Sequence, residues 1–313
     1  MARRVLLIDD DRMQAMITKA SFAQFRQEKF EVEWAETYEK GLRKLLSGEF
    51  CACLLDYQLG PRDGLELIRE ALASGCRVPI IFLTAEKGEN IDIQAMDAGA
   101  LDYLIKGEIN TQALERSLRY ALKLGDTLEA LRQLATHDAL TGLLNRREFD
   151  RVLAEEYERS RRFGRPYAIV TLDLDHFKSV NDRFGHPAGD FVLKTAVQRI
   201  SRQLRSVDRF ARVGGEEFAI VLTEVDYVTA GEVAKRIVGM MARTPMLLPD
   251  GTKLDVTLSA GSASIPRNAP DPVALVQVAD RALYEAKTRG RNRAVAAVEL
   301  EPGYELNQAQ PEI

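Results

Sequence analysis

Residues 5–10 read Val-Leu-Leu-Ile-Asp-Asp, a short apolar run that is closed at once by two carboxylates. Similar runs follow at 51–55, 78–83 and 101–105, with a weaker one at 30–34. Helix-length amphipathic stretches separate them, at about 12–28, 37–47, 64–74, 89–98 and 110–122. This alternation predicts an α/β domain over residues 1–122, a doubly wound, five-stranded parallel (βα)5 sheet covered on both faces.

Polar residues follow the apolar runs at the points where the strands are expected to end. They are Asp9, Asp10, Asp56, Thr84 and Lys106. Because functional groups gather at the carboxyl ends of parallel strands, these side chains are expected to converge. Clustered carboxylates repel one another unless a cation lies among them, and an oxygen-rich cluster suits Mg²⁺. A lone strand-end aspartate is more often a turn or cap residue, but this matched set favours a functional site.

The segment resembles a response-regulator receiver domain over residues 3–122. The matching strings end in or contain Asp9-Asp10, Leu-Leu-Asp56, Asp63-Gly64, Phe-Leu-Thr84-Ala and Tyr103-Leu-Ile-Lys106. The resemblance implies that a cognate histidine kinase phosphorylates Asp56, and that Asp10 and Asp56 hold one Mg²⁺ with help from Asp9.

The resemblance also implies a switch pair, Thr84 and Tyr103, and a contact from Lys106 to the acyl phosphate. Two departures from the family pattern are visible. The loop after Asp56 reads Tyr-Gln-Leu-Gly-Pro rather than ending in Met-Pro, and Gly107 stands where proline usually follows the lysine. Neither departure removes a reacting group.

Residues 110–135 contain no proline and one glycine, Gly125. A stripe at alternating three- and four-residue spacing, broken by Ser117, comprises Leu114, Ala121, Leu124, Leu128, Leu131 and Ala135. This spacing is typical of a coiled coil, whereas a last receiver helix packed on its own sheet explains only the first half. We expect one long helix, or two joined at Gly125, with a linker at 123–135 that pairs in a homodimer.

The second half opens with Asp-Ala-Leu-Thr-Gly-Leu-Leu-Asn-Arg-Arg at 138–147. A predicted strand at 167–172 runs into Asp173, and strands at 209–213 and 218–222 flank Gly-Gly-Glu-Glu at 214–217. The double glycine is expected to supply the positive φ angles of a tight hairpin turn. Carboxylates from two strands suit two-metal phosphoryl chemistry, although a double glycine alone could mark only a solvated hairpin.

Three basic side chains are candidate phosphate contacts: Lys178, Lys287 and Arg291. The last two are four residues apart, so they are expected on one face of a helix if that helix persists.

These strings resemble the GGDEF domain of diguanylate cyclases over about 136–298, here with Gly-Gly-Glu-Glu-Phe at 214–218. The resemblance implies an α+β, nucleotidyl-cyclase-like fold. It implies that two facing subunits each bind GTP, and that each 3′-hydroxyl attacks the other's α-phosphate. The products would be cyclic di-GMP and two pyrophosphates.

The same resemblance assigns roles residue by residue, with two Mg²⁺ ions in each active site. The metal ligands would be Asp173, Glu216, Glu217 and the Leu174 carbonyl, and the catalytic set Asp173, Glu216 and Glu217, the last also a possible base. Asn181 and Asp190 would read guanine, while the triphosphate would contact Lys178, Lys287, Arg291 and the backbone near His176, Phe177, Gly214 and Gly215.

A second ligand site is expected at Arg205-Ser-Val-Asp208, which five residues separate from Gly214. In the family an Arg-x-x-Asp at this distance binds inhibitory product, with Arg236 as an accessory contact. Arginine can bind a phosphate or the guanine Hoogsteen edge, and aspartate can accept from guanine. Without that fixed distance, four such residues would indicate only surface charge.

The formal net charge of −4 hides a strong asymmetry along the 313 residues. Residues 1–122 and the tail at 299–313 each sum to −4, whereas 123–298 sums to +4. The total argues against a nucleic-acid polymer as partner, and no apolar run is long enough to span a membrane. Three cysteines without metal-ligand spacing favour the cytoplasm, and we expect a disordered acidic tail.

Two functions remain open at this point. The first is a response regulator that synthesises cyclic di-GMP, is activated by phosphorylation of Asp56 and is inhibited by product. The alternative is a catalytically silent receiver–GGDEF sensor that binds cyclic di-GMP through Arg205 and Asp208. A cyclase of different base specificity is disfavoured by Asn181 and Asp190.

Overall fold

The computed structural model describes residues 3–26, 28–85 and 91–300. Contacts divide the chain into two compact units, Met1–Gln133 and Leu134–Ile313. The division falls near the end of a long helix, and the domain limits given above remain predictions. Of the tail at 299–313, residues 301–313 lie outside the described residues. In the part of the chain that is described, no helix has the length and apolar character that a membrane span requires.

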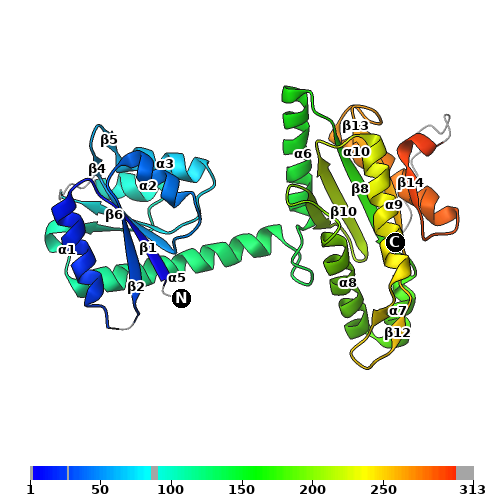
Figure 1. The fold of residues 1–313 in the computed structure, drawn as a ribbon, viewed down its shortest axis with the longest axis horizontal. Helices are drawn as coiled ribbons and strands as arrows, with labels where there is room; N and C mark the ends of the chain where they lie inside the picture. Colours follow the sequence, from blue (N-terminus) through cyan, green and yellow to red (C-terminus); the bar gives the residue numbers. More distant parts are fainter. Residues whose placement is uncertain (1–2, 27, 86–90, 301–313) are drawn as a thin grey trace. The chain divides into compact units, whose positions relative to one another are not determined.

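The first unit contains the expected parallel sheet, in the order β2-β1-β3-β6-β7 (Figure 1). The strands are β1 (Arg3–Ile8), β2 (Phe30–Ala35), β3 (Ala52–Asp56), β6 (Ile80–Thr84) and β7 (Asp102–Ile105). All four pairings are parallel. Alternate residues of β1 face opposite cores, Leu6 and Ile8 on one side and Val5 and Leu7 on the other. The doubly wound sheet predicted from the sequence is confirmed.

Helices cover both faces of this sheet. Helices α2 (Tyr38–Leu45), α3 (Gly64–Ala73) and α4 (Ile91–Ala98) contribute to one core, and α1 (Arg12–Ala23) and α5 (Thr111–Thr136) to the other. Helix α1 begins where the Asp11 carboxylate accepts from the backbone N–H groups of Met13 and Gln14. It ends earlier than the predicted residue 28, because Phe25 turns inward and stacks on Phe22 with ring centroids 4.7 Å apart.

Helix α5 continues without a break through Gly125. A Cβ at that position would lie 2.4 Å from Cγ of Pro79, so a glycine is required by close packing. The first half of α5 is buried against the sheet, and Ser117 fits there because its hydroxyl donates to Asp102 at 2.5 Å. Beyond Lys123, Leu124 and Leu131 of the predicted stripe are 43% and 56% exposed. Homodimer pairing through this stripe remains a prediction.

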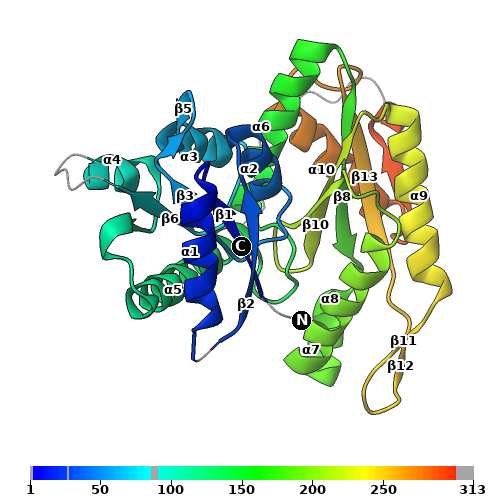
Figure 2. The same cartoon turned by 60° about the vertical axis from the view of Figure 1, so that its left-hand side comes forward.

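The second unit is an α+β domain with a mixed sheet, in the order β14-β13-β8-β10-β9. The strands are β8 (Tyr167–Leu174), β9 (Arg209–Arg212), β10 (Glu217–Thr223), β13 (Leu258–Ile265) and β14 (Ala294–Ala296). Only β13 and β14 pair in parallel; the other three pairings are antiparallel. The strands β11 (Met246–Leu247) and β12 (Lys253–Leu254) form a separate ribbon (Figure 2).

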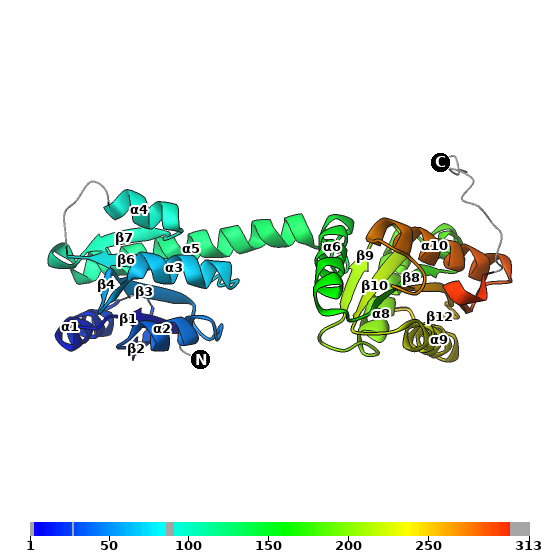
Figure 3. The same cartoon turned by 90° about the horizontal axis from the view of Figure 1, so that it is seen from above.

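Helices flank both faces of this sheet (Figure 3). Helices α7 (Phe177–Phe184), α8 (His186–Ser201) and α9 (Tyr227–Arg243) pack on one face, and α6 (Arg146–Phe163) and α10 (Pro272–Thr288) on the other. The strand expected to end at residue 172 continues to Leu174, so Asp173 is part of β8. Helix α8 ends at Ser201, which leaves Arg205 in the following turn.

Candidate functional site

The first acidic site lies at the carboxyl ends of the parallel strands. Asp9 follows β1, Asp56 ends β3, and carboxylate oxygens of Asp9, Asp10 and Asp56 all lie within 4.8 Å of one another. Asp9 and Asp56 are buried, whereas Asp10 is exposed and accepts a hydrogen bond of 3.0 Å from the Gly60 N–H. The strand ends therefore bring together the three carboxylates that the sequence singled out.

Lys106 supplies the positive charge of this site. Its Nζ lies 2.8 Å from Oδ1 of Asp56 and 3.0 Å from Oδ2 of Asp9. Burial raises the pKa of Asp56 to about 6; Lys106 opposes the shift, and the charge on Asp9 adds to it. Burial also raises the pKa of Asp9. One ammonium leaves three carboxylates with excess negative charge, so the all-oxygen cluster fits Mg²⁺ held by Asp9, Asp10 and Asp56.

The expected switch residues lie on neighbouring strands. Thr84 is buried at the end of β6, and Tyr103, on β7, is 37% exposed. The unusual loop after Asp56 forms a small hairpin of β4 (Gln58–Leu59) and β5 (Arg62–Asp63). Arg62 stacks over the Tyr38 ring at 3.6 Å and pairs with Glu66 and Glu70, which fixes the hairpin whose Gly60 contacts Asp10.

The second acidic site lies where β8 and β10 pair. Asp173 is directly opposite Glu217 in the antiparallel register, and the Leu174 N–H donates to the Glu216 carbonyl at 3.3 Å. Lys287, from α10, places its Nζ 2.7 Å from Oδ2 of Asp173. The fold thus gathers two strands and one helix around the predicted catalytic carboxylates.

Mutual repulsion is evident in the electrostatics of this second site. Burial raises the pKa of Asp173; Lys287 opposes the shift and Glu217 adds to it. Burial, with the charges of Asp173 and Glu217, likewise raises the pKa of Glu216, against the effect of Lys287. Asp173, Glu216 and Glu217, with one lysine beside Asp173, form an oxygen donor set with excess negative charge, and with the Leu174 carbonyl this chemistry suits Mg²⁺. Among the described residues, the carboxylates of Asp9, Asp10 and Asp56 are gathered more closely than this second set.

The double glycine does not have the positive φ angles that the sequence predicts. Neither Gly214 nor Gly215 has a φ in the left-handed region. Space is the constraint instead: a Cβ on Gly214 would lie 2.4 Å from Oε2 of Glu217, whereas one on Gly215 would meet no atom within 4 Å. The first glycine leaves room for the Glu217 carboxylate, and the second keeps the tip of the turn open.

The residues expected to read guanine come from two packed helices, α7 and α8. A Cβ on Gly189 would lie 2.0 Å from Oδ1 of Asn181, so this glycine lets α8 approach the Asn181 side chain. Asp190 follows it and is exposed. His176, with φ of 57°, precedes the first turn of α7, where Phe177 is buried and Lys178 is exposed.

Lys287 and Arg291 would share one helix face only if the helix continued through both, and it does not. Helix α10 ends at Thr288, and Gly290 then adopts a φ of 108°. The Arg291 N–H donates back to the Ala286 carbonyl at 3.0 Å, a helix-ending contact across the glycine. Arg291 therefore belongs to the turn after α10 rather than to the helix.

Two further residues, Asp175 and Arg212, have structural contacts that the sequence did not assign. Asp175, in the 173–178 string, is buried and accepts hydrogen bonds from the Thr257 and Ser259 hydroxyls and from the Asn292 N–H. Arg212 donates to Asp138 and to the Gly215 carbonyl, which ties the 138–147 string to the glycine turn. Apart from Gly215, which is three residues from Arg212, these partners are distant in sequence, so short-range patterns could not reveal them.

Arg205 and Asp208 of the expected product site lie in the turn after α8 and are already paired. The Arg205 guanidinium lies 2.7 Å from Oδ1 of Asp208 and donates to the Thr223 carbonyl at 2.9 Å. Arg236 donates to the Gln203 carbonyl at 2.8 Å. The side chains of Arg205, Asp208 and Arg236 therefore all border the turn after α8.

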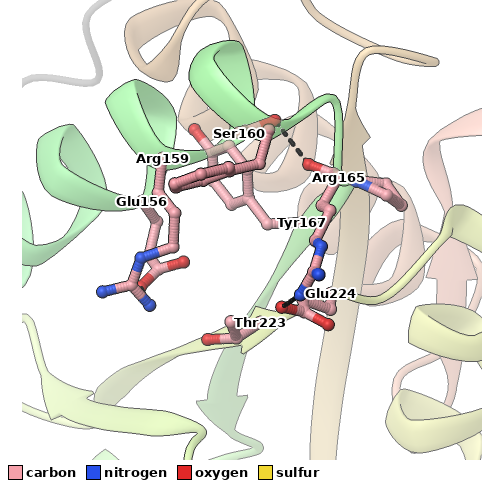
Figure 4. A pocket seen from close by; sticks show the side chains of 9 residues that line it. Glu156, Arg159, Ser160, Arg165, Tyr167, Thr223 and Glu224 are labelled. Carbon is pink, nitrogen blue, oxygen red and sulfur yellow. Dashed lines mark hydrogen bonds and ion pairs between the residues drawn. The ribbon is translucent and has the colours of Figure 1, made fainter.

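Thr223 also lines a cavity of about 170 Å³ between α6, the start of β8 and the end of β10 (Figure 4). Arg165 at its rim pairs with Glu224, and the Ser160 hydroxyl donates to the Arg165 carbonyl at 2.6 Å. The cavity also borders Arg159, whose guanidinium pairs with Glu156 at 3.0 Å. These charged groups at the rim are thus paired with one another.

Comparison with protein families follows the same division of the chain. Residues 135–293, more than half of the chain, match the family model described as diguanylate cyclase, GGDEF domain. The chain belongs to the GGDEF family. Residues 5–119 match the response regulator receiver domain, so this family member carries an N-terminal receiver.

Two relatives found by sequence similarity agree with this assignment. The chain is 32% identical over 280 residues to diguanylate cyclase TpbB of Pseudomonas aeruginosa, covering 87% of this chain and 64% of TpbB. It is 29% identical over 307 residues to response regulator PleD of Caulobacter vibrioides, covering 93% of this chain and 65% of PleD. The chain thus spans less than two thirds of either relative.

Among solved structures, the coiled coil and GGDEF domain of DgcB from Caulobacter crescentus, in complex with c-di-GMP, is similar with a TM-score of 0.55. The two are 30% identical, and the match covers 59% of this chain and 97% of DgcB as solved.

Proposed function

We propose that this GGDEF family member is a diguanylate cyclase response regulator that joins two GTP molecules into cyclic di-GMP. One observation carries the proposal: Asp173 and Glu217 face each other across β8 and β10, with Glu216 beside them and Lys287 2.7 Å from Asp173. An all-oxygen site with one lysine suits the charge of a metal-bound triphosphate.

In the proposed reaction, each subunit binds one GTP and two subunits face each other. The 3′-hydroxyl of each ribose attacks the α-phosphorus of the other GTP; the new P–O bond replaces the bond to pyrophosphate, which leaves. Glu217 accepts the hydroxyl proton. When bound, Mg²⁺ would neutralise charge on the phosphate oxygens and lower the pKa of the attacking hydroxyl. Asp173, Glu216, Glu217 and the Leu174 carbonyl would hold it.

The remaining roles concern binding and orientation. Asn181 and Asp190 bind the guanine edge, and Gly189 sets the distance between their helices. Lys178, Lys287 and Arg291 bind the triphosphate, together with the backbone near His176, Phe177, Gly214 and Gly215. Because Lys287 is paired with Asp173, it can pass from the carboxylate to a phosphate oxygen when substrate arrives.

Homodimerisation is part of the proposal, since one subunit cannot supply both attacking groups. The exposed leucines of α5 beyond Lys123 support pairing of that helix with its twin. GTP as substrate supports a cytoplasmic location.

Regulation at two further sites completes the proposed function. A histidine kinase transfers a phosphoryl group to Asp56, where Lys106 and one Mg²⁺ balance the added charge, and the Thr84–Tyr103 pair responds. Cyclic di-GMP binds at Arg205, Asp208 and Arg236 and inhibits turnover. The preformed Arg205–Asp208 pair also supports the alternative of a catalytically silent sensor of cyclic di-GMP.

One experiment separates the two candidates. The purified chain is incubated with GTP and Mg²⁺, and cyclic di-GMP is measured by chromatography; binding of cyclic di-GMP is measured by calorimetry. A cyclase turns GTP over, and Glu217→Gln abolishes turnover while product binding persists. If the phosphorylated, dimeric wild type leaves GTP intact but binds cyclic di-GMP tightly, the cyclase is excluded and the chain is a sensor.

Phosphorylation control has its own test. Acetyl phosphate or the cognate kinase is expected to stimulate the wild type and not Asp56→Asn. Equal stimulation of both would overturn the assignment of Asp56.

A further inference from the structure

Asp175 is a buried carboxylate whose hydrogen bonds join three distant segments of the second unit. Its Oδ1 accepts from the Ser259 hydroxyl at 2.7 Å. Its Oδ2 accepts from the Thr257 hydroxyl at 2.7 Å and from the Asn292 N–H at 3.0 Å. Both oxygens are therefore engaged by β13, by the residue just before it and by the turn after α10, and the carboxylate is not available as a ligand of the neighbouring acidic site.

The turn held by Asp175 has an unusual backbone. Gly290, Arg291 and Asn292 have φ values of 108°, 62° and 48°, three consecutive residues in the left-handed region. Only glycine adopts that region without cost, and a long side chain such as that of arginine adopts it rarely. Such a conformation persists only where the surroundings hold it.

The hydrogen bond from Asn292 to Asp175 is the contact that joins this turn to the end of β8. On one side of the turn, Arg291 caps α10 through Ala286; on the other, the Arg293 carbonyl accepts from the Ala260 N–H at 2.9 Å. Between these two anchors, Asp175 fixes the middle of the turn. Asp173, two residues earlier and still within β8, binds Lys287 at the end of α10. One strand end therefore sets the place of both basic residues.

We propose that Asp175 is a positioning residue for the GTP triphosphate: it holds the left-handed turn at 290–293 so that Arg291 stays aimed at the phosphates. This inference rests on the proposed function, because it takes Arg291 as a phosphate contact. Asp175 itself touches no substrate. Its effect is to hold the arginine before GTP binds, so that binding does not have to order the turn.

The test is a double-mutant cycle on the full-length chain, with initial rates of cyclic di-GMP formation against GTP concentration. Asp175→Ala is expected to raise KM for GTP about tenfold, with a smaller change in kcat, because a lost phosphate contact weakens ground state and transition state alike. Arg291→Ala is expected to raise KM by as much or more. In the Arg291→Ala background, Asp175→Ala should change KM less than about twofold, because coupled residues are not additive.

Two further variants separate positioning from a merely structural role. Thr257→Val/Ser259→Ala removes the two hydroxyl donors and keeps the Asn292 bond, so it should lower Tm as Asp175→Ala does and leave KM within about twofold. Asp175→Asn keeps an acceptor for the Asn292 N–H, so its KM for GTP should return most of the way to the wild-type value. If Asp175→Ala does not fold, the cycle is run with Asp175→Ser, whose shorter polar side chain does not reach the Asn292 N–H. KM effects that multiply with those of Arg291→Ala overturn the inference.

The outcomes distinguish the two levels of the argument. An active wild type in which Asp175→Ala lowers Tm without raising KM, or in which its KM effect is independent of Arg291, overturns the positioning role and leaves the cyclase intact. A wild type that neither binds GTP nor forms cyclic di-GMP overturns the proposed function, and the positioning role with it.

Discussion

The two acidic sites of this chain use the same parts in different geometries. Each combines three carboxylates with one lysine that pairs with an aspartate at 2.7 or 2.8 Å. In the receiver, the carboxyl ends of parallel strands gather Asp9, Asp10 and Asp56 within 4.8 Å. In the second unit, an antiparallel pair spreads Asp173, Glu216 and Glu217 along the edge between β8 and β10, where Glu217 is exposed.

The difference in geometry corresponds to the size of what each site must take. Under the proposed function, the compact cluster, with Asp9 and Asp56 buried and Asp10 exposed, takes one cation and one phosphoryl group. The more open pair of strands, beside a turn without side chains, takes a nucleoside triphosphate. We call the carboxylates of the receiver the closed site and those of the second unit the open site. The comparison predicts that formation of cyclic di-GMP depends on the open site alone, whereas the closed site governs only the response to phosphorylation.

The largest effect is expected for Asp173→Asn. Removing the buried carboxylate that faces Glu217 should lower the rate of cyclic di-GMP formation at least about a hundredfold, because stabilisation of charge at phosphate is lost. The rate is measured by chromatography of the nucleotides. Asp255→Asn, at an exposed position outside both sites, is the matched control and should act as wild type. Substantial turnover in Asp173→Asn would break the comparison.

A smaller effect is expected for a single methyl group at the glycine turn. Gly214→Ala places a Cβ 2.4 Å from Oε2 of Glu217, so the carboxylate must move, and kcat should fall roughly tenfold. Gly107→Ala, next to Lys106 in the receiver, meets no atom within 4 Å and serves as the control. Equal losses in both variants would show that the effect of the added methyl is not local to Glu217.

The smallest effect is one of stability, and it is expected in the closed site. The pKa of Asp56 rises from 3.8 to about 6 on folding. Between these pH values the folded chain binds more protons than the unfolded chain, so Asp56 makes folding less favourable as the pH rises through this window. At pH 7.5 without metal, Asp56→Asn should therefore raise the free energy of unfolding by about 1–3 kcal/mol.

That gain should shrink as the pH falls from 6 toward 4, because the wild-type carboxyl is then protonated in the folded chain. Urea unfolding of both chains at pH 7.5 and 4.5 measures it, with the exposed Asp97→Asn as control. A variant less stable than wild type at pH 7.5 would contradict the repulsion assigned to the closed site.

Sequence patterns predicted the positions of the receiver strands well because each strand is a continuous apolar run. The run at 5–8 lies within β1, and Asp9 directly after it lies beside Asp10 and Asp56 as expected. The end of α10 was missed, although Gly290, a glycine of the type that ends helices, was visible in the sequence. A four-residue spacing says nothing about where a helix stops, which is why Lys287 and Arg291 were placed on one face.

Contacts between distant residues were beyond the reach of the sequence. The partners of Asp175 lie 82, 84 and 117 positions away, and only the folded sheet brings them together. The need for Gly214 was predicted, but for its backbone angles rather than for the space taken by Glu217. A motif thus identified which residues matter before it could say why.

The pairing of Lys106 with Asp56 and of Lys287 with Asp173 has a practical consequence. Each ammonium offsets part of the carboxylate charge without any metal, so the fold of either unit is expected to survive chelation. A preparation treated with EDTA should stay folded and stop forming cyclic di-GMP, and added magnesium should restore this activity within the mixing time. Free magnesium would then control the rate of the proposed reaction without being needed for the stability of the fold.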